Sequence, residues 1–340
     1  MGVLPDLLPG YRPVDLSMGR EEFERRWGER LSPDRGLTLV EMIQGAISGH
    51  ITSMYVIGEN PVITDPDRSK TIEALKRLDF FVCQDIFLSD TARFADVVLP
   101  GASFTEKDGT FTNTERRVQR LKKAIDPPGD ARTDMEILLM LGKSMGYEKQ
   151  FSYKDAQDVF DEIRDLVPEY RGITYERLKS GGIQWPCPHE GHPGTPSLFS
   201  DGFEKRKGRF FQVDFRPGDR MPDEEFPFCL IVGRSLYHYH SGTMSRRIEG
   251  NNEVAGEPFI EMHPDDAKRM GISDGDWVKI YSETGHITGK VSISNRLNPR
   301  ILFTTFHFPD MPVNLVTGSR LDPISKIPSL KMVPVKISRY

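Results

Sequence analysis

The chain has 340 residues, of which 37% are hydrophobic and 28% charged, and its formal net charge at pH 7 is −5. This length allows two domains with separate cores. The sequence contains no apolar run long enough to span a bilayer, and its first residues lack the pattern of a secretory signal. Because the acidic balance argues against general nucleic-acid binding, we expect a cytoplasmic protein with no membrane segment and no nucleic-acid partner.

The three cysteines do not form a metal-binding pattern. No pair among Cys83, Cys187 and Cys229 has Cys-x-x-Cys spacing, so neither an iron–sulfur cluster nor a four-cysteine zinc site is expected. Cys83 and Cys229 lie in apolar runs, where a cysteine is usually a small buried residue. Cys187 with His189 and His192 allows a zinc hypothesis, but the intervening prolines and the lack of a fourth ligand argue against it.

The first third of the chain is predicted to alternate helices and strands. The apolar patterns predict helices over 19–28, 37–48 and 66–78 and strands over 54–57 and 80–83. Asp65 and Pro66 suit the N-cap and first position of the third helix. The strand over 54–57 is apolar on both faces, which suits a parallel strand covered by helices. The strand–helix–strand order predicts a right-handed βαβ unit.

Polar residues follow both of these strands. Gly58, Glu59 and Asn60 come after the first strand, and Gln84 and Asp85 come after the second. Each turn alone could be an ordinary polar loop. Because ligands bind at the carboxyl ends of parallel strands, the two turns together favour a binding crevice at one edge of the sheet.

The next stretch contains a long polar segment and a helix. A short helical turn over 90–95 and a strand over 96–99 precede residues 101–120, which are predicted to form a surface loop or an irregular hairpin. A helix over 135–145 follows, with Ile137, Leu138 and Leu141 expected to face inward.

The remaining chain divides by composition. Residues 151–180 are predicted to form one or two helices, and the Pro- and Gly-rich residues 181–225 an extended connection between domains. The C-terminal part shows strands over 228–232, 259–262, 277–282, 286–294, 301–308 and 333–337 and one helix over 264–271. We therefore expect an α/β domain over 1–180 and a compact, Greek-key-like or interlocked β-barrel over 226–340.

A basic loop follows the first strand of this barrel. Its sequence from residue 232 is Val-Gly-Arg-Ser-Leu-Tyr-His-Tyr-His-Ser-Gly-Thr-Met-Ser-Arg-Arg. Three guanidinium groups, of Arg234, Arg246 and Arg247, would suit a pyrophosphate. The alternative is a solvated basic turn at the end of a strand.

This loop resembles the start of the C-terminal dinucleotide-binding domain of molybdopterin oxidoreductases, and most of all that of formate dehydrogenase catalytic subunits. Three further stretches of the family recur here in the same order. They are Gln-Asp-Ile-Phe-Leu-Ser-Asp-Thr-Ala-Arg-Phe-Ala-Asp-Val-Val-Leu-Pro from residue 84, Asp-Gly-Thr-Phe-Thr-Asn-Thr-Glu-Arg-Arg from residue 108 and Asp-Pro-Ile-Ser-Lys-Ile-Pro from residue 322. The resemblance covers the whole chain but only the second half of the family's subunit.

The resemblance implies a Rossmann-like parallel-sheet domain followed by a double-psi β-barrel. It also implies a bis-molybdopterin guanine dinucleotide cofactor (bis-MGD) with molybdenum or tungsten. Asp85, Lys107 and Asp134 would contact the nucleotide end, and His238, His240 and Phe306 the pterin side. The residues that match the family's cofactor contacts are Gly58, Glu59, Asn60, Gln84, Asp85, Lys107, Asp134, Gly233, Arg234, Leu236, His238, His240, Phe306, Asn314 and Lys331. From the residues alone, Lys107 could be an ordinary surface lysine and Asp134 simply a helix-start residue.

The family's cluster cysteines, its metal-ligating cysteine or selenocysteine and its active-site histidine and arginine have no counterpart in this sequence. We therefore expect no catalytic or metal-binding residue here, and activity only with an N-terminal half and iron–sulfur or flavin electron-transfer subunits. A non-catalytic dinucleotide-binding module and another enzyme of the family are the alternatives. A nicotinamide dehydrogenase is disfavoured because no Gly-x-Gly-x-x-Gly follows the strand over 54–57.

Overall fold

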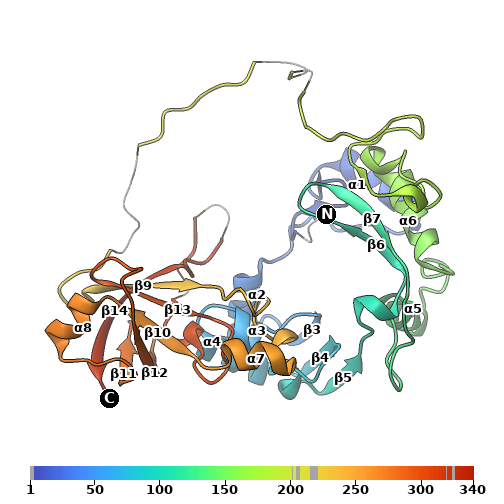
Figure 1. Cartoon of the computed structure of the whole chain (residues 1–340). Helices are drawn as coiled ribbons and strands as arrows, with labels where there is room; N and C mark the ends of the chain where they lie inside the picture. Colours follow the sequence, from blue (N-terminus) through green and yellow to red (C-terminus); the bar gives the residue numbers. More distant parts are fainter. Residues whose placement is uncertain (1–3, 201, 204–206, 215–220, 319, 324–325) are drawn as a thin grey trace. The chain divides into compact units, whose positions relative to one another are not determined.

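The computed structural model describes residues 4–200, 202–203, 207–214, 221–318, 320–323 and 326–340 (Figure 1). The chain forms two compact units, each of which is discontinuous in sequence. Unit 1 comprises Met1–Thr38 and Leu99–Gln212, and unit 2 comprises Leu39–Val98 and Val213–Tyr340. The sequence did not predict that residues 39–98 would group with the C-terminal part. Among the described residues, no helix is both long and apolar enough to cross a membrane.

The α/β part of unit 2 is built on a three-stranded sheet. Its order is β3 (Ser53–Ile57), β4 (Phe80–Asp85) and β5 (Val97–Pro100), and β3 and β4 are parallel. The helical elements beside it are α2 (Leu39–Ser48), α3 (Pro61–Thr64), α4 (Arg68–Arg77) and η1 (Ala92–Phe94). The predicted parallel βαβ unit is therefore confirmed.

The predicted start of the helix between these strands is wrong. Pro61 begins the short helix α3, which was not predicted, and Asp65 is the residue that ends it. The N-cap of α4 is Asp67, whose carboxylate accepts a hydrogen bond from the Lys70 N–H and whose φ is +52°. The Asp-Pro pair suits an N-cap, but α3 occupies the preceding residues and moves the start of α4 beyond residue 66.

One face of this sheet packs well and the other does not. Val56, Phe81 and Cys83 are buried in a cluster with the helices. Ile57 and Phe80 remain exposed, as do the two valines of β5. The expectation that helices cover β3 on both faces is thus not met within the described residues.

The C-terminal part of unit 2 is a closed, six-stranded barrel, as predicted. The barrel order is β10-β12-β11-β14-β9-β13, with β10/β12 and β9/β13 parallel. The strands are β9 (Phe228–Gly233), β10 (Phe259–Met262), β11 (Trp277–Tyr281), β12 (His286–Ile293), β13 (Ile301–Thr305) and β14 (Met332–Arg339). The helical elements are η5 (Ser245–Arg247), α7 (Glu249–Ala255), α8 (Pro264–Met270) and η6 (Val313–Leu315). The helix α7 was not predicted, and β13 is shorter than predicted.

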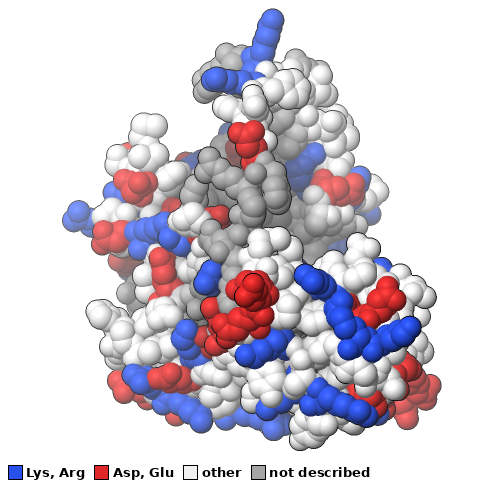
Figure 2. Space-filling model, turned by 90° about the vertical axis from the view of Figure 1, so that its left-hand side faces the viewer, with Lys and Arg blue, Asp and Glu red and all other residues white. Residues whose placement is uncertain are grey.

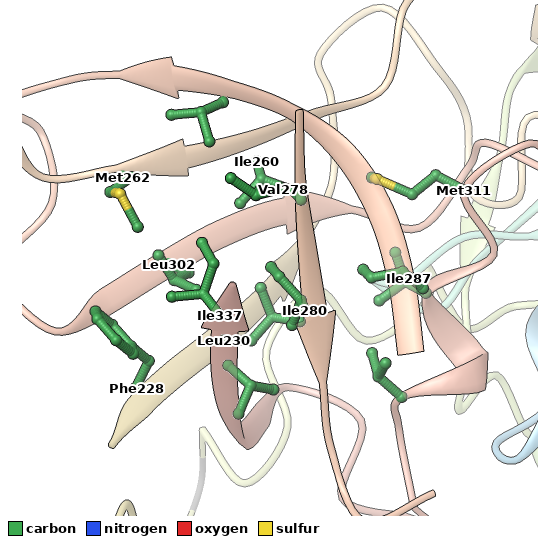
Figure 3. Packing of buried hydrophobic residues seen from close by; sticks show 14 of the residues in the cluster. Phe228, Leu230, Ile260, Met262, Val278, Ile280, Ile287, Leu302, Met311 and Ile337 are labelled. Atoms are coloured by element: carbon green, nitrogen blue, oxygen red, sulfur yellow. The ribbon is translucent and has the colours of Figure 1, made fainter. Parts of the chain in front are cut away.

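Alternation along the strands fills the barrel interior. Leu230, Ile280, Leu302 and Ile337 come from four strands and point into one core, as Figure 3 shows. Burial of such a side chain stabilises the fold by about 1.5–3 kcal/mol. Period-two patterning is therefore what specifies this barrel. Cys229 is buried in β9, as expected.

Unit 1 contains a small antiparallel sheet of order β6-β7-β8, with helices beside it. The hairpin alternative for residues 101–120 is confirmed. The strands are β1 (Leu7–Leu8), β2 (Arg12–Pro13), β6 (Gly109–Thr112), β7 (Arg117–Leu121) and β8 (Ile183–Gln184). The helical elements are α1 (Ser17–Trp27), η2 (Phe104–Glu106), α5 (Asp134–Ser144), α6 (Ala156–Leu166), η3 (Pro168–Tyr170) and η4 (Arg177–Ser180).

Two expectations for unit 1 need correction. In α5 only Ile137 and Gly142 are buried, whereas Leu138 and Leu141 are exposed, because the helix packs within its unit along one narrow stripe. Residues 183–195 are not an open connection, since β8 pairs with β7 and Cys187 is fully buried. Residues 201, 204–206 and 215–220 of the predicted connection lie outside the described residues.

The side chain of Cys187 makes packing contacts inside unit 1. The Nη1 of Arg177 donates to the Cys187 Sγ over 3.3 Å, and the Nη2 of Arg177 donates to the carbonyl of His192. Within the part of the chain that the structure describes, no three His, Cys, Asp or Glu side chains are arranged to hold a metal ion.

Candidate functional site

Three strands of the barrel bring predicted contact residues to one rim. Gly233 ends β9 opposite Thr305 at the end of the parallel strand β13. Lys331 immediately precedes the antiparallel strand β14, and its carbonyl accepts a hydrogen bond of 3.2 Å from the Val232 N–H. Arg234, Phe306 and Lys331 therefore leave the barrel at the same end. We call these residues, with His240, the barrel rim.

The barrel rim is basic and aromatic. The Lys331 Nζ lies 5.8 Å from the centre of the Phe306 ring, and the His240 ring lies 5.4 Å from that same ring. Burial, the Arg234 guanidinium and the Lys331 ammonium lower the pKa of His240, while Glu59 acts in the opposite direction. Such a rim can bind an anion and the face of a planar ring.

Positive charge is concentrated at local features such as the barrel rim. On the face of the molecule seen in Figure 2, lysine and arginine side chains are interspersed with acidic ones. A nucleic-acid-binding surface would instead gather one sign of charge over a broad area.

The predicted sheet edge is formed by the ends of β3 and β4. Gly58 has a φ of +63°, which favours glycine, and its N–H donates to the Gln84 carbonyl over 2.8 Å. The side-chain oxygen of buried Gln84 accepts a hydrogen bond from Tyr55. Asp85 accepts a hydrogen bond from the Ile86 N–H at 2.7 Å. The turn places Gly58 and Glu59 at the surface beside the end of β4.

The sheet edge meets the loop of residues 234–247 inside unit 2. The Asn60 Nδ2 donates to the Thr243 Oγ1 over 3.2 Å. The Arg247 guanidinium lies 4.1 Å from the centre of the Phe87 ring, just beyond β4. Two groups of residues that were predicted separately are therefore brought together. The contacts through Phe87 and Thr243 were not predicted, because neither residue stands out by type in its motif.

Two of the predicted contact residues use their polar atoms within the chain. The Asn60 Oδ1 accepts hydrogen bonds from the N–H and the hydroxyl of Thr91, at 3.2 and 2.8 Å. The Asn314 Nδ2 donates to the carbonyls of Ile63 and Asp65, at 2.7 and 2.8 Å. Both side chains are buried, so both hold loops in place. Leu236, by contrast, is 92% exposed.

His238 is also engaged internally. Its Nε2 donates to the Ala255 carbonyl over 2.8 Å, which leaves Nδ1 of the neutral ring to accept from the Ser245 hydroxyl at 3.3 Å. The buried His307 ring stacks on it with 4.4 Å between ring centres. His307 was not singled out from the sequence, although it follows the predicted Phe306.

We expect the His307 ring to stay neutral down to about pH 4. Burial, then His238 and then Arg246 lower its pKa to about 4. Because this folded-state pKa lies below the unfolded value, the unfolded chain binds the proton first, and stability is lost as pH falls from about 6.5 to about 4. Proton and nitrogen NMR of histidine-labelled chain, assigned with His307→Phe, measures the midpoint. A midpoint at or above 6.5 would contradict this reading.

Unit 1 holds the remaining two predicted contact residues. Lys107 and Asp134 form an ion pair. Asp134 is the first residue of α5, whose N-cap is Thr133. A cavity of about 410 Å³ lies there, lined by Lys107, Thr133 and the residues Glu106, Asp108, Lys123, Pro127, Gly129, Asp130, Ala131, Arg132 and Glu136. The structure thus pairs Lys107 with Asp134 in unit 1, and places the other predicted contacts in unit 2.

Similarity to known proteins covers the whole chain. The family model of the molybdopterin oxidoreductases matches residues 25–144, and that of the molybdopterin dinucleotide binding domain matches residues 228–334. In solved structures, acetylene hydratase from Pelobacter acetylenicus is similar with a TM-score of 0.69 at 17% sequence identity. That match covers 88% of this chain and 46% of the other. The likeness shows a shared fold.

Curated relatives are similar at higher identity. The F420-dependent formate dehydrogenase subunit alpha of Methanocaldococcus jannaschii is 48% identical, over 100% of this chain and 50% of that protein. The assimilatory nitrate reductase catalytic subunit of Bacillus subtilis is 36% identical (99% and 49%), and formate dehydrogenase H of Escherichia coli is 35% identical (99% and 48%). This chain spans about half the length of these relatives. It belongs to the molybdopterin oxidoreductase family.

Proposed function

We propose that this chain is the C-terminal half of a formate dehydrogenase catalytic subunit and binds bis-MGD carrying molybdenum or tungsten. The observation that carries the proposal is the meeting of the barrel rim's loop with the sheet edge, through Asn60–Thr243 and Arg247–Phe87. A ligand lying along this junction would contact both. The similarity to formate dehydrogenase alpha subunits supports the choice of substrate class.

The residues at the barrel rim fit this cofactor. Arg234 and Lys331 provide cationic donors for a pyrophosphate, and Phe306 provides a face for a planar ring. The buried Nε of Arg246, in the same loop, has no hydrogen-bond partner among the described residues and can donate to an acceptor.

The pair in unit 1 has the chemistry to contact a guanine nucleotide. The Asp134 carboxylate can accept from the N1–H and amino group of a guanine, and Lys107 can donate to an oxygen of the same nucleotide. The cavity beside them provides space for a base. When bound, the cofactor's metal would take up the two electrons released as formate becomes carbon dioxide. This chain's residues would bind and orient the dinucleotide.

We also propose the domain types and the partners of this chain. The α/β part would be Rossmann-like, within residues 1–180, and the barrel would be of the double-psi type, within 226–340. The exposed face of the β3-β4-β5 sheet, with Ile57 and Phe80, would pack against the N-terminal half of the subunit. Iron–sulfur or flavin subunits would carry the electrons onward in the cytoplasm.

Substitutions of predicted contact residues in each unit test the proposal in the enzyme reassembled with its N-terminal half. Arg234→Ala, Lys331→Ala and Asp134→Ala should each lower pterin and metal retention about 10- to 100-fold, because a hydrogen bond to a charged group contributes about 1.5–3 kcal/mol. Pterin fluorescence and elemental analysis after gel filtration measure the retention.

Two matched controls separate this effect from general loss of charge. Lys336→Ala removes a lysine of β14, the strand that Lys331 precedes. The Lys336 Nζ lies 3.9 Å from Glu225. Asp126→Ala removes an exposed carboxylate of unit 1 that does not line the cavity beside Lys107. Both controls should retain the cofactor. Unchanged pterin content in all three test variants would count against the assignment.

A second candidate is another reaction of the same family. The similarity to an assimilatory nitrate reductase catalytic subunit favours it specifically. Assay of the reassembled enzyme with formate and an oxidised dye, and with nitrate and a reduced dye, separates the two. Cofactor binding by the chain alone, with no partner that restores activity, would instead identify a non-catalytic binding module.

A further inference from the structure

Asp65 lies at the joint between the α/β part of unit 2 and the barrel. It ends α3, and its carbonyl accepts a 2.8 Å hydrogen bond from Asn314 in the barrel's η6. Two residues later, the Asp67 N–H donates to the Thr317 carbonyl over 3.1 Å. Asn314 and Thr317 of the barrel therefore hold the backbone of residues 65–67 in place.

Two polar atoms at this joint lack partners. Asp65 and Thr71 are 5% and 0% exposed, and the Asp65 Oδ2 and Thr71 Oγ1 have no hydrogen-bond partner among the described residues. Both residues line one narrow pocket of about 10 Å³, with α2 on its other side. A water molecule needs about that volume and at least two polar partners. An unpaired buried carboxylate would cost several kcal/mol.

We propose that this cavity binds one water molecule, shared by the Asp65 Oδ2 and the Thr71 Oγ1, and that the Asp65 carboxyl is protonated while it donates to this water. The neutral carboxyl donates its proton to the water oxygen, and the water donates one of its hydrogens to the Thr71 oxygen. Both buried oxygens are then satisfied. Ionisation releases the proton to solvent and leaves a negative charge in the cavity.

The charged groups around the cavity do not neutralise that charge. Lys70 lies 2.7 Å from the Asp67 Oδ2 and is engaged by it, and the Arg68 Nε donates to a backbone carbonyl. The α2 residues that line the cavity are uncharged: Leu39, Val40, Ile43 and Gln44. Asn314 in η6 and Thr317 beyond it, which contact the joint, are also neutral.

Burial of Asp65 and the nearby Glu59 carboxylate both favour the protonated form of the Asp65 carboxyl. Burial raises the pKa of Asp65 to about 7, Thr64 opposes this through a hydrogen bond, and Glu59 adds to it. The joint should therefore weaken as pH rises from about 4 to about 7, and change little above that. This inference does not depend on the proposed cofactor.

Infrared spectra of the full chain test the protonation directly. At pH 6 the wild type should show the carbonyl band of a buried, protonated carboxylic acid, and the band should fade with a midpoint near 7. Asp65→Asn should lack the band, whereas Asp79→Asn, at an exposed aspartate, should keep it. Absence of the band from the wild type at pH 6 would overturn the proposal without any variant.

Urea unfolding tests the link to stability. Because the folded-state pKa is raised, stability is present in full below the unfolded value of about 4 and is lost as pH rises through about 7. The midpoint of Asp65→Asn minus that of the wild type should therefore rise from pH 4 to 7 and then level off. A difference that is constant with pH would contradict the proposal.

A second variant tests the water itself. Thr71→Val keeps the shape of the side chain but removes one of the two partners. A high-resolution crystal structure at pH 6 should show one water in the wild-type cavity and none in this variant. Hydrogen exchange of the Asp67 amide, corrected for its intrinsic rate, should accelerate as pH rises from about 4 to about 7 in the wild type, and much less in Asp65→Asn. A dry wild-type cavity, or equal acceleration in both proteins, would refute the proposed site.

Discussion

Replacement of Asn314 by alanine is expected to lower the free energy of unfolding by about 2–5 kcal/mol, since each buried group left unpaired costs about 1–3 kcal/mol. The amide of Asn314 serves two carbonyls, those of Ile63 and Asp65, and the alanine variant leaves both buried and without this donor. Urea denaturation of the full chain, without cofactor, measures the effect.

A matched control is available in the same unit. Asn298→Ala removes an exposed asparagine, and should change stability by less than about 0.5 kcal/mol. The comparison also separates two roles of Asn314, which the family resemblance marks as a cofactor contact. A loss of stability without cofactor supports the structural role. If the Asn314 variant unfolds at the wild-type urea concentration, the described hydrogen bonds contribute nothing measurable.

Replacement of Gly233 by alanine is expected to destabilise unit 2 by about 1–3 kcal/mol, the usual cost of overpacking. A Cβ at this position would lie 2.3 Å from the Cε2 of Phe303 and 2.7 Å from its Cζ. Phe303 belongs to β13, whose backbone pairs with β9 at this point, so the ring has to shift within the barrel wall. The shift would also displace Arg234, the next residue, and so weaken anion binding.

Gly250 provides the control for this change. It lies in α7, and a Cβ there would meet nothing within 4 Å. Gly250→Ala should therefore leave stability unchanged or raise it by about 0.5–1 kcal/mol. Thermal unfolding of the two variants in parallel measures the difference. Equal stability of the two would show that Phe303 relaxes without cost.

The predicted contact residues fall into two groups with different expected phenotypes. Arg234, His240 and Lys331 are exposed at the barrel rim, and their loss should reduce ligand binding more than stability. Asn60 and His238 are buried and bonded within the chain, so their loss should reduce stability first.

Two buried groups of unit 2, Asp65 and His307, change stability in opposite directions over one pH range. Asp65, with its raised pKa, removes stability as pH rises towards 7. His307, with its lowered pKa, removes stability as pH falls towards 4. The wild type should therefore show a flatter pH profile than a variant at either residue.

The sequence by itself determined most of the helices and strands and the short family motifs. Alternation in β9 and β12 and the glycine after β3 are local patterns, because strand period and a left-handed turn depend on a few neighbouring residues. The order of elements then gave the parallel pair and the barrel. The family motifs were visible for the same reason, since each lies within one short segment.

The tertiary structure decided which of these residues are available to a ligand. Asn60 bonds to Thr243 across 183 positions, and Asn314 bonds to the carbonyl of Ile63 across 251. Such contacts group residues 39–98 with the barrel and turn Asp65 from an expected helix cap into a buried carboxyl. Local propensity cannot foresee them, because burial and hydrogen bonding at these sites are set by segments that meet only in the folded chain.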